Sequence, residues 1–180
     1  MSENPSNSDP GNYLVGLFGL QGKTAVVIGG TGVLGGAIAI ALASAGAHVI
    51  IVGRNPDAGA QRVGEISVLG GSAEFFAADN TSRADLERLT AHLMQQDREC
   101  HILVNGAGVN SPTPFLEITD EEWDRIFNVN LTGVRLACQI IGGYMLRRNT
   151  QGSIINIASL SAVTPLSRVF TYSASKAAVL

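Results

Sequence analysis

The stretch 24-TAVVIGGTGVLGGAIAIALASAGAHVIIVG-53 decides the fold of this chain. It begins with an apolar run, passes through a Gly-rich turn into an Ala/Ile-rich helical pattern, and ends in a second apolar run. None of its thirty residues carries a formal charge at neutral pH, and seven of them are glycine. A hydropathy scan would flag a membrane span. The glycines and the change of pattern instead favour a buried strand–helix–strand unit with parallel strands.

The same alternation of apolar runs and helical patterns continues beyond this unit. Strands are predicted at residues 24–28, 48–52, 73–77, 102–105 and 153–158. Helices are predicted between them, at about residues 33–45, 57–69, 83–96 and 120–148, the last with a bend or an early end at Gly142-Gly143. Crossovers between parallel strands are right-handed. This order therefore predicts an α/β fold with a doubly wound parallel sheet in the Rossmann-like strand order 3-2-1-4-5.

The composition indicates one folded domain with a disordered start. The chain has 180 residues, of which 46% are hydrophobic and 15% are charged, whereas disordered chains show the opposite balance. Residues 1–16 lack Lys and Arg and contain Pro, Ser and Asn. We therefore predict a disordered N-terminal tail over residues 1–16 and one folded domain over residues 17–180.

Charge and cysteine content narrow the classes of partner. The formal net charge is −3, and the basic residues, ten Arg and two Lys, are scattered along the chain. This gives no electrostatic basis for binding nucleic acid or an anionic membrane. Cys100 and Cys138 fall at predicted core positions, which favours reduced thiols and a cytoplasmic protein. His48, His92 and His101 are isolated, so we predict no metal site.

A Gly-rich turn joins the first strand to the first helix, with the sequence Gly-Gly-Thr-Gly-Val-Leu-Gly-Gly at residues 29–36. Glycine there permits a tight turn and lets the backbone approach a pyrophosphate, while the helix N-terminus supplies free N–H groups. A Gly-rich turn alone is weak support, but its place between a strand and a helix favours a dinucleotide site. The contacts predicted in this turn are Gly29, Thr31, Gly32, Val33, Leu34 and Gly35.

The end of the second strand bears on the choice of cofactor. An NAD-binding site usually places a carboxylate there for the adenosine ribose hydroxyls, but this chain has Gly53-Arg54-Asn55. An Arg fork matches a 2′-phosphate, and no acid is present to repel it. The sequence therefore favours NADP(H), with Arg54 and Asn55 as contacts. A surface Arg with NAD(H) bound is the alternative.

Two later strand ends complete the predicted cofactor site. Asp79, after the third strand, is placed to accept a hydrogen bond from the adenine amino group, or equally to cap the helix that starts near Ser82. Small residues after the fourth strand let the backbone pass close to a cofactor. The contacts predicted here are Asp79, Asn80, Asn105, Ala107 and Gly108.

Tyr172 and Lys176 are four residues apart, so they share one face of a helix. An ammonium group one turn away favours the phenolate form of a tyrosine, and Lys176 can also donate to the nicotinamide ribose. Ser159, after the fifth strand, can hydrogen-bond a substrate carbonyl or alkoxide. Asn130 lies in a predicted helix, where Asn is unfavourable. Either a water bridge to Lys176 or a solvent-facing side chain would explain it.

Several stretches together resemble the short-chain dehydrogenase/reductase family, over essentially all of residues 17–180. They are the turn at 29–35, Asp79, Asn-Gly-Ala-Gly at 105–108, Asn-Val-Asn-Leu-Thr-Gly at 128–133, Asn-Ile-Ala-Ser at 156–159 and Tyr-Ser-Ala-Ser-Lys at 172–176. The resemblance implies a catalytic tetrad of Asn130, Ser159, Tyr172 and Lys176, with Tyr172 and Lys176 also touching the cofactor. It also implies a homo-oligomer, a dimer or tetramer, paired through the helix at 120–148.

The chain departs from the family pattern in its Gly-rich turn. The glycines follow G-x-x-G-x-x-G rather than G-x-x-x-G-x-G, Ile28 stands in place of the usual Thr, and Gly106 in place of an Asn. The turn, the Asn-Gly-Ala-Gly and Thr-Pro-Leu-Ser-Arg at 164–168 look similar to bacterial sugar-acid members of the fructuronate reductase (mannonate oxidoreductase) type, which implies a role in carbohydrate metabolism. Substrate contacts implied there are Asn110, Ser159 and Arg168. Arg168 would pair with a substrate carboxylate, or else simply face solvent.

The expected activity is hydride transfer between a nicotinamide cofactor and a small secondary alcohol or ketone, with Tyr172 as general acid/base. Members of the resembled family usually continue with further strands after the catalytic helix. We therefore expect the C-terminal strands to be missing and a literal 180-residue chain to be poorly stable, aggregation-prone or inactive. The alternative function is a non-catalytic nucleotide-binding or oligomerising fragment of such an enzyme.

Overall fold

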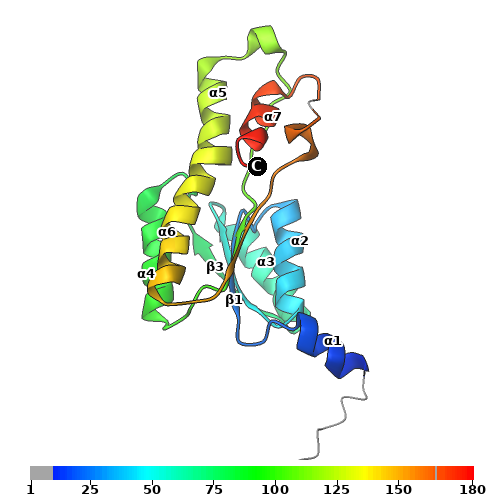
Figure 1. The fold of residues 1–180 in the computed structure, drawn as a ribbon, viewed down its shortest axis with the longest axis vertical. Coiled ribbons are helices and arrows are strands. Elements are labelled where there is room, and N and C mark those ends of the chain that lie inside the picture. Colours follow the sequence, from blue (N-terminus) through cyan, green and yellow to red (C-terminus); the bar gives the residue numbers. More distant parts are fainter. Residues whose placement is uncertain (1–9, 165) are drawn as a thin grey trace, which may run out of the picture.

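A parallel β-sheet runs through the centre of the molecule (Figure 1). The computed structural model describes residues 10–164 and 166–180. The strands are β1 (Thr24–Ile28), β2 (His48–Gly53), β3 (Ser72–Ala77), β4 (Ile102–Asn105) and β5 (Ser153–Asn156). They lie in the order β3-β2-β1-β4-β5, and each neighbouring pair is parallel. This confirms the predicted doubly wound sheet and its strand order.

Helices cover both faces of the sheet (Figure 1). The larger ones beside it are α2 (Val33–Ser44), α3 (Pro56–Val68), α4 (Arg83–Gln95) and α6 (Gly133–Arg147). One core cluster joins α4 and α6 to the sheet through side chains such as Leu89 and Ile141, both fully buried. A second cluster joins α2 and α3 to the opposite face through Ala39 and Ile66. The strands carry side chains into both clusters, as parallel strands with two covered faces do.

The charge-free stretch forms β1, α2 and β2 at the centre of this arrangement. All five residues of β1 are buried, and the strand pairs with β2 on one side and β4 on the other. The apolar run is thus explained by burial inside the sheet, as predicted. Over the described ranges, no helix has both the length and the apolar character that crossing a bilayer requires.

The predicted helix at 120–148 is interrupted. It consists of α5 (Asp120–Phe127), a turn of π-helix η2 (Asn128–Thr132) and α6. At its start, the Thr119 hydroxyl accepts a hydrogen bond from the Glu122 N–H and so caps the helix. The early end at the Gly142-Gly143 pair is wrong, because α6 continues to Arg147. Gly142 instead allows close packing, since a Cβ there would lie 3.3 Å from Cδ1 of Ile154 on β5.

The predicted disordered tail is wrong for residues 10–16, which belong to helix α1 (Pro10–Phe18). Pro10 suits the first position of a helix because its φ angle is already helical. The helix ends where the Gly19 N–H donates to the Val15 carbonyl at 2.8 Å. Figure 1 shows α1 extending from the lower end of the body. The rest of that prediction, residues 1–9, lies outside the described residues.

Strand β5 forms one edge of the sheet in the described chain. Its side chains Ile154 and Ile155 are 41% and 45% exposed, whereas all residues of β1 are buried. Exposed β-branched residues on a sheet edge favour pairing with further polypeptide. The expectation that strands are missing after residue 180 stays a prediction.

Candidate nucleotide and proton-transfer site

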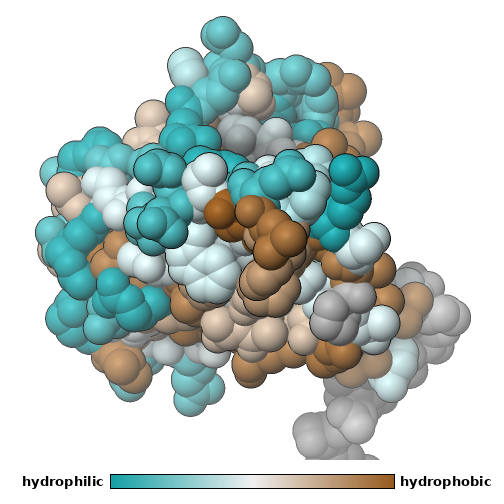
Figure 2. All heavy atoms as spheres, turned by 90° about the horizontal axis from the view of Figure 1, so that it is seen from above, coloured by the Kyte–Doolittle hydropathy of each residue, from teal (hydrophilic) through white to brown (hydrophobic). Residues whose placement is uncertain are grey.

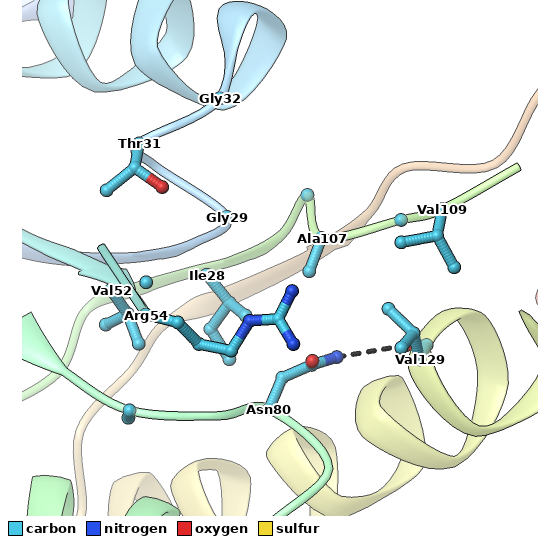
Figure 3. A pocket seen from close by; sticks show the side chains of 14 residues that line it. Ile28, Gly29, Thr31, Gly32, Val52, Arg54, Asn80, Ala107, Val109 and Val129 are labelled. Atoms are coloured by element: carbon cyan, nitrogen blue, oxygen red, sulfur yellow. Dashed lines mark hydrogen bonds between the residues drawn. The ribbon is translucent and has the colours of Figure 1, made fainter. Parts of the chain in front are cut away.

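A cavity of about 230 Å³ opens at the carboxyl ends of the central strands (Figure 3). Seven predicted cofactor contacts line it, namely Gly29, Thr31, Gly32, Arg54, Asn80, Ala107 and Gly108. Seven further lining residues were not predicted, namely Ile28, Val52, Gly53, Ala78, Gly106, Val109 and Val129. Most of these end a strand or follow one directly, which is the signal that could have found them. Val129 had a different signal, its place beside Asn130.

The Gly-rich turn brings backbone segments together that no larger residue would allow. Gly29 has a φ angle of +79°, and a Cβ on it would lie 2.7 Å from the Ala107 nitrogen. A Cβ on Gly35 would lie 2.3 Å from the Gly29 carbonyl oxygen. Helix α2 begins after Gly32, without a side-chain cap and without an acidic residue in its first turn. Its N-terminal N–H groups therefore suit the phosphates of a nucleotide.

Three of the predicted contacts in the turn do not line the cavity. Val33 and Leu34 are 92% and 57% exposed, and Gly35 is buried against Gly29. We predicted that every residue of the turn would contact the cofactor. The side chains of Val33 and Leu34 instead project to solvent from the first turn of α2.

Arg54 extends into the cavity from the end of β2, and Figure 3 shows its guanidinium between Asn80 and Ala107. The side chain is 72% exposed, and its Nη1 lies 3.7 Å from Oδ2 of Asp79. Thr31 lies over Gly53, where a Cβ would be 2.7 Å from the Thr31 hydroxyl oxygen. The residue after β2 thus presents a guanidinium to the cavity, and the turn between β1 and α2 presents the hydroxyl of Thr31.

Asn55 is not placed as predicted. Its Oδ1 accepts hydrogen bonds from the N–H groups of Asp57 and Ala58 at 3.0 and 3.1 Å, so the side chain caps α3. Asn followed by Pro56 at the first helical position is a common helix start. The local capping pattern therefore accounts for this residue better than a cofactor does.

Asp79 and Asn80 shape the loop between β3 and α4. Oδ1 of Asp79 accepts from the N–H and the hydroxyl of Thr81 at 2.9 and 2.7 Å. The cap of α4 is Ser82, whose hydroxyl accepts from the Asp85 N–H, so the alternative role of Asp79 as that cap is wrong. Nδ2 of Asn80 donates to the Val129 carbonyl at 2.9 Å, which ties this loop to η2. A contact from Asp79 to adenine stays a prediction.

Asn105 does not face the cavity. It is 2% exposed, and its Nδ2 donates to Oδ1 of Asn156 on the neighbouring strand at 2.8 Å. The same Nδ2 lies 3.5 Å from the Cys138 sulfur on α6. The side chain is therefore directed to the neighbouring strand rather than to the cavity, and a contact between Asn105 and the cofactor stays a prediction.

Lys176 is buried at the side of this cavity. It lies on α7 (Phe170–Ala177), is 3% exposed, and donates from Nζ to the Ile157 carbonyl at 2.7 Å. Burial lowers the pKa of Lys176 below its ordinary value. Its Nζ lies 5.9 Å from the ring centroid of Tyr172, so the amine and the phenol are neighbours on α7 as predicted.

Gly108 joins this amine to the cavity. It lines the cavity, and a Cβ on it would lie 3.5 Å from both Lys176 Nζ and Asn130 Oδ1. The cavity and the Lys176 amine are therefore separated by one glycine. Two motifs more than sixty residues apart in the sequence, Asn-Gly-Ala-Gly and Tyr-Ser-Ala-Ser-Lys, meet at this point.

Asn130 is buried and fully bonded. Its Oδ1 accepts from the Val109 N–H at 2.8 Å, and its Nδ2 donates to the Val109 carbonyl at 3.0 Å and to the Ser175 hydroxyl at 2.9 Å. The solvent-facing alternative is therefore wrong, and the side chain bonds directly to the protein on three sides. A π-turn with an inward-pointing Asn explains why this residue interrupts the helix.

Ser159 lies in the turn that packs against α7. It precedes the short 3-10 helix η3 (Leu160–Ala162), and its hydroxyl accepts from the Ser161 N–H at 3.2 Å. The hydroxyl oxygens of Ser159 and Ser161 are 2.9 Å apart. Ser159 comes two residues after Ile157, whose carbonyl accepts a hydrogen bond from Lys176. It is thus placed near the amine, and its contact with substrate stays a prediction.

The other predicted substrate contacts are exposed. Asn110 accepts from the N–H of its neighbour Ser111, and Arg168 has a left-handed backbone with a φ angle of +63°.

Figure 2 looks down on the end that carries α5 and α7 and shows hydrophobic surface between hydrophilic regions. Exposed apolar side chains are Phe115 and Leu116 in the short 3-10 helix before α5, Leu160 and Val163 in and after η3, and Phe170 at the start of α7. In residues 10–164 and 166–180, no three His, Cys, Asp or Glu side chains are grouped to hold a metal ion.

Comparisons with known proteins match this geometry. A profile of the short chain dehydrogenase family matches residues 23–180. The chain is 37% identical over 162 residues to the 2,3-dihydro-2,3-dihydroxybenzoate dehydrogenase of Bacillus subtilis strain 168, covering 90% of this chain and 62% of that protein. It therefore spans less than two thirds of that relative's length.

Two solved structures show similar folds. One is a metagenomic short-chain oxidoreductase in complex with NADP, with a TM-score of 0.82 and 32% identity, covering 89% of this chain and 72% of that one. The other is a 7α-hydroxysteroid dehydrogenase complexed with NADH and 7-oxo glycochenodeoxycholic acid. It also has a TM-score of 0.82 and 32% identity, covering 89% of this chain and 62% of that one. Similar chains thus hold either nicotinamide cofactor.

The burial of Lys176 can be tested by labelling, because Lys23 is the other lysine of the chain and is exposed. We expect an amine-reactive reagent to modify Lys176 at least about tenfold more slowly than Lys23 in the native protein, and equally fast in urea. The reason is that Lys176 Nζ is buried and bonded to Ile157. Peptide mass spectrometry measures both rates. Equal native rates would show that the amine is not held as described.

Proposed function

The chain belongs to the short-chain dehydrogenase family, and we propose that it forms the nucleotide-binding and proton-transfer part of an oxidoreductase. The reaction is hydride transfer between a nicotinamide cofactor and a secondary alcohol or ketone. One observation carries this proposal, namely that Gly108 borders both the cavity and the Lys176 amine. A nucleotide along the cavity would end beside the residues that handle the proton.

When bound, the nicotinamide would supply or accept the hydride. Tyr172 would pass a proton to the substrate oxygen as the ketone is reduced and take it back in the reverse direction. Lys176, in its cationic form, would stabilise the negative charge that develops on the phenol oxygen. Ser159 would hydrogen-bond the substrate oxygen. Asn130 would hold the loop at Val109 and the helix α7 in their relative positions.

NADP(H) is the cofactor that we propose. Arg54 supports it, because its exposed guanidinium lies in the cavity where the adenosine ribose would lie. Thr31 supports it too. Its side chain lies over Gly53 and leaves no room there for the carboxylate that an NAD site usually carries at the end of this strand. Asp79 opposes it weakly, as its carboxylate lies 3.7 Å from the same guanidinium. NAD(H) is the alternative.

The substrate class stays broad. The names of the Bacillus relative and of the steroid dehydrogenase describe ring compounds that carry hydroxyl groups, and this supports a secondary alcohol. A sugar-acid substrate of the fructuronate type has no support from these relatives. Its structural basis is Arg168, which is exposed and which would have to turn toward the cavity to pair with a carboxylate.

We also propose self-association and a cytoplasmic location. The outward face of α5 and α6 carries Glu121 and Asp124 near one end and Arg135 further along. Two such helices in antiparallel contact would place opposite charges together.

Two free cysteines support a reducing compartment, and burial raises the pKa of Cys100 to about 12. The alternative is a fragment that binds nucleotide or self-associates without turnover.

Tyr172→Phe tests the proton-transfer role. We expect turnover of NADPH with a panel of ketones, read at 340 nm, to fall at least about a hundredfold, because general acid catalysis is lost. Binding of NADPH should stay within about twofold, since the ring and its contacts remain. Tyr13→Phe on α1 is the matched control and should turn over normally. Full activity of Tyr172→Phe would remove the proposed proton donor, and inactivity of the unaltered chain would favour the fragment alternative.

Arg54→Ser tests the cofactor proposal. Loss of the guanidinium should weaken NADPH binding about tenfold or more while leaving NADH binding nearly unchanged, because NADH lacks the 2′-phosphate. Dissociation constants from nucleotide fluorescence measure both. Arg147→Ser, at the end of α6, is the control. If the unaltered chain binds NADH at least tenfold more tightly than NADPH, the assignment is wrong.

A further inference from the structure

Ser175 is a fully buried polar residue to which neither the sequence motifs nor the proposed chemistry gives a role. It is 0% exposed and lies on α7, directly before Lys176. Its hydroxyl donates to the Tyr172 carbonyl at 2.7 Å and accepts from Nδ2 of Asn130 at 2.9 Å. A serine hydroxyl has one hydrogen to donate, and that hydrogen is used within α7.

Ser175 is the last member of a hydrogen-bond chain that starts at the cavity. Val109 lines the cavity, and both of its main-chain polar groups are bonded to the amide of Asn130. The amide has two N–H hydrogens, one of which goes to Val109 and the other to Ser175. This series of hydrogen bonds therefore runs from the cavity loop through the π-turn to the main chain of Tyr172. The two side chains in it, Asn130 and Ser175, are both fully buried.

Two polar tethers hold α7 in place. Lys176 bonds to the Ile157 carbonyl and Ser175 bonds to Asn130. Adjacent residues of a helix point about 100° apart around its axis. The two tethers consequently act in different directions. One alone would let the helix rotate about the contact, whereas both together set its rotation.

We propose that Ser175 is a positioning residue that sets the rotation of α7 and thereby directs Tyr172 and Lys176 toward the cavity. This inference rests on the proposed function for its effect on turnover, but the hydrogen bond itself can be observed without turnover. Removing the hydroxyl leaves one N–H of Asn130 without an acceptor in a site closed to water. A buried unsatisfied donor is costly, so the helix would shift or the site would open.

Helix α7 offers a matched control. Ser173 is 5% exposed, two residues earlier on the same helix, and within the described chain its hydroxyl has no hydrogen-bond partner. Ser173→Ala therefore removes a buried hydroxyl of the same kind without breaking a tether. Ser175→Cys is an intermediate variant, because a thiol is nearly the same shape but a weaker hydrogen-bonding group.

The first measurement is hydrogen exchange of the Asn130 side-chain amide by NMR, assigned by its disappearance in Asn130→Asp. Both amide protons should be protected in the unaltered chain and in Ser173→Ala. One should exchange at least about tenfold faster in Ser175→Cys and Ser175→Ala, since its acceptor is weakened or lost. Fast exchange of both protons in the folded, unaltered chain would overturn the proposal, whether or not the protein is active.

The second measurement is steady-state turnover against NADPH affinity. Ser175→Ala should lower kcat about tenfold with the NADPH dissociation constant within about twofold, and Ser175→Cys should fall between it and the unaltered chain. Ser173→Ala should match the unaltered chain. A folded Ser175→Ala with normal kcat, or an equal loss in Ser173→Ala, would contradict the positioning role. If the unaltered chain shows no turnover while its Asn130 amide is protected, the proposed function fails and the tether itself stands.

Discussion

The site depends on how closely three stretches of backbone meet at the carboxyl end of β1. The carbonyl of Gly29 faces the first turn of α2 so closely that a methyl group on Gly35 would overlap it. On its other side Gly29 is packed against Ala107, at the end of β4. This contact leaves a cavity lined largely by main chain, with the start of α2 directed into it. Main-chain N–H groups and a helix N-terminus are suited to phosphate, so the same packing that closes the fold creates the binding surface.

A second constraint couples this cavity to the residues proposed to move the proton. The helix at 120–148 must admit a turn of π-helix for Asn130 to point inward. Once buried, the amide can satisfy itself only by bonding to the loop after β4 and to α7. The interruption of the helix is therefore explained by tertiary bonds. Single turns of π-helix inside α-helices are frequent at functional segments.

The sequence predicted those features that depend on short-range patterns. The apolar runs gave five strands because each is buried in the sheet, and the Gly-rich turn was found because its spacing follows a strand and opens a helix. The pairing of Tyr172 with Lys176 followed from helical spacing alone.

Features that depend on distant contacts or on strand parity were missed. The side chain of Asn105 turns toward β5, and Asn55 caps its own helix, although both stand beside true cavity residues. The bonds of Asn130 and Ser175 join segments 45 residues apart, and nothing in the local pattern marks them.

We propose that the meeting point of Gly29, Gly35 and Ala107 forms a nucleotide site. Isothermal titration calorimetry of NADPH with the unaltered chain and with Gly35→Ala tests it most directly. We expect saturable binding of one NADPH per chain, weakened at least about tenfold in Gly35→Ala, because the added methyl group would displace the Gly29 main chain. Absence of saturable binding by a folded, unaltered chain, or equal affinity in the variant, would contradict it.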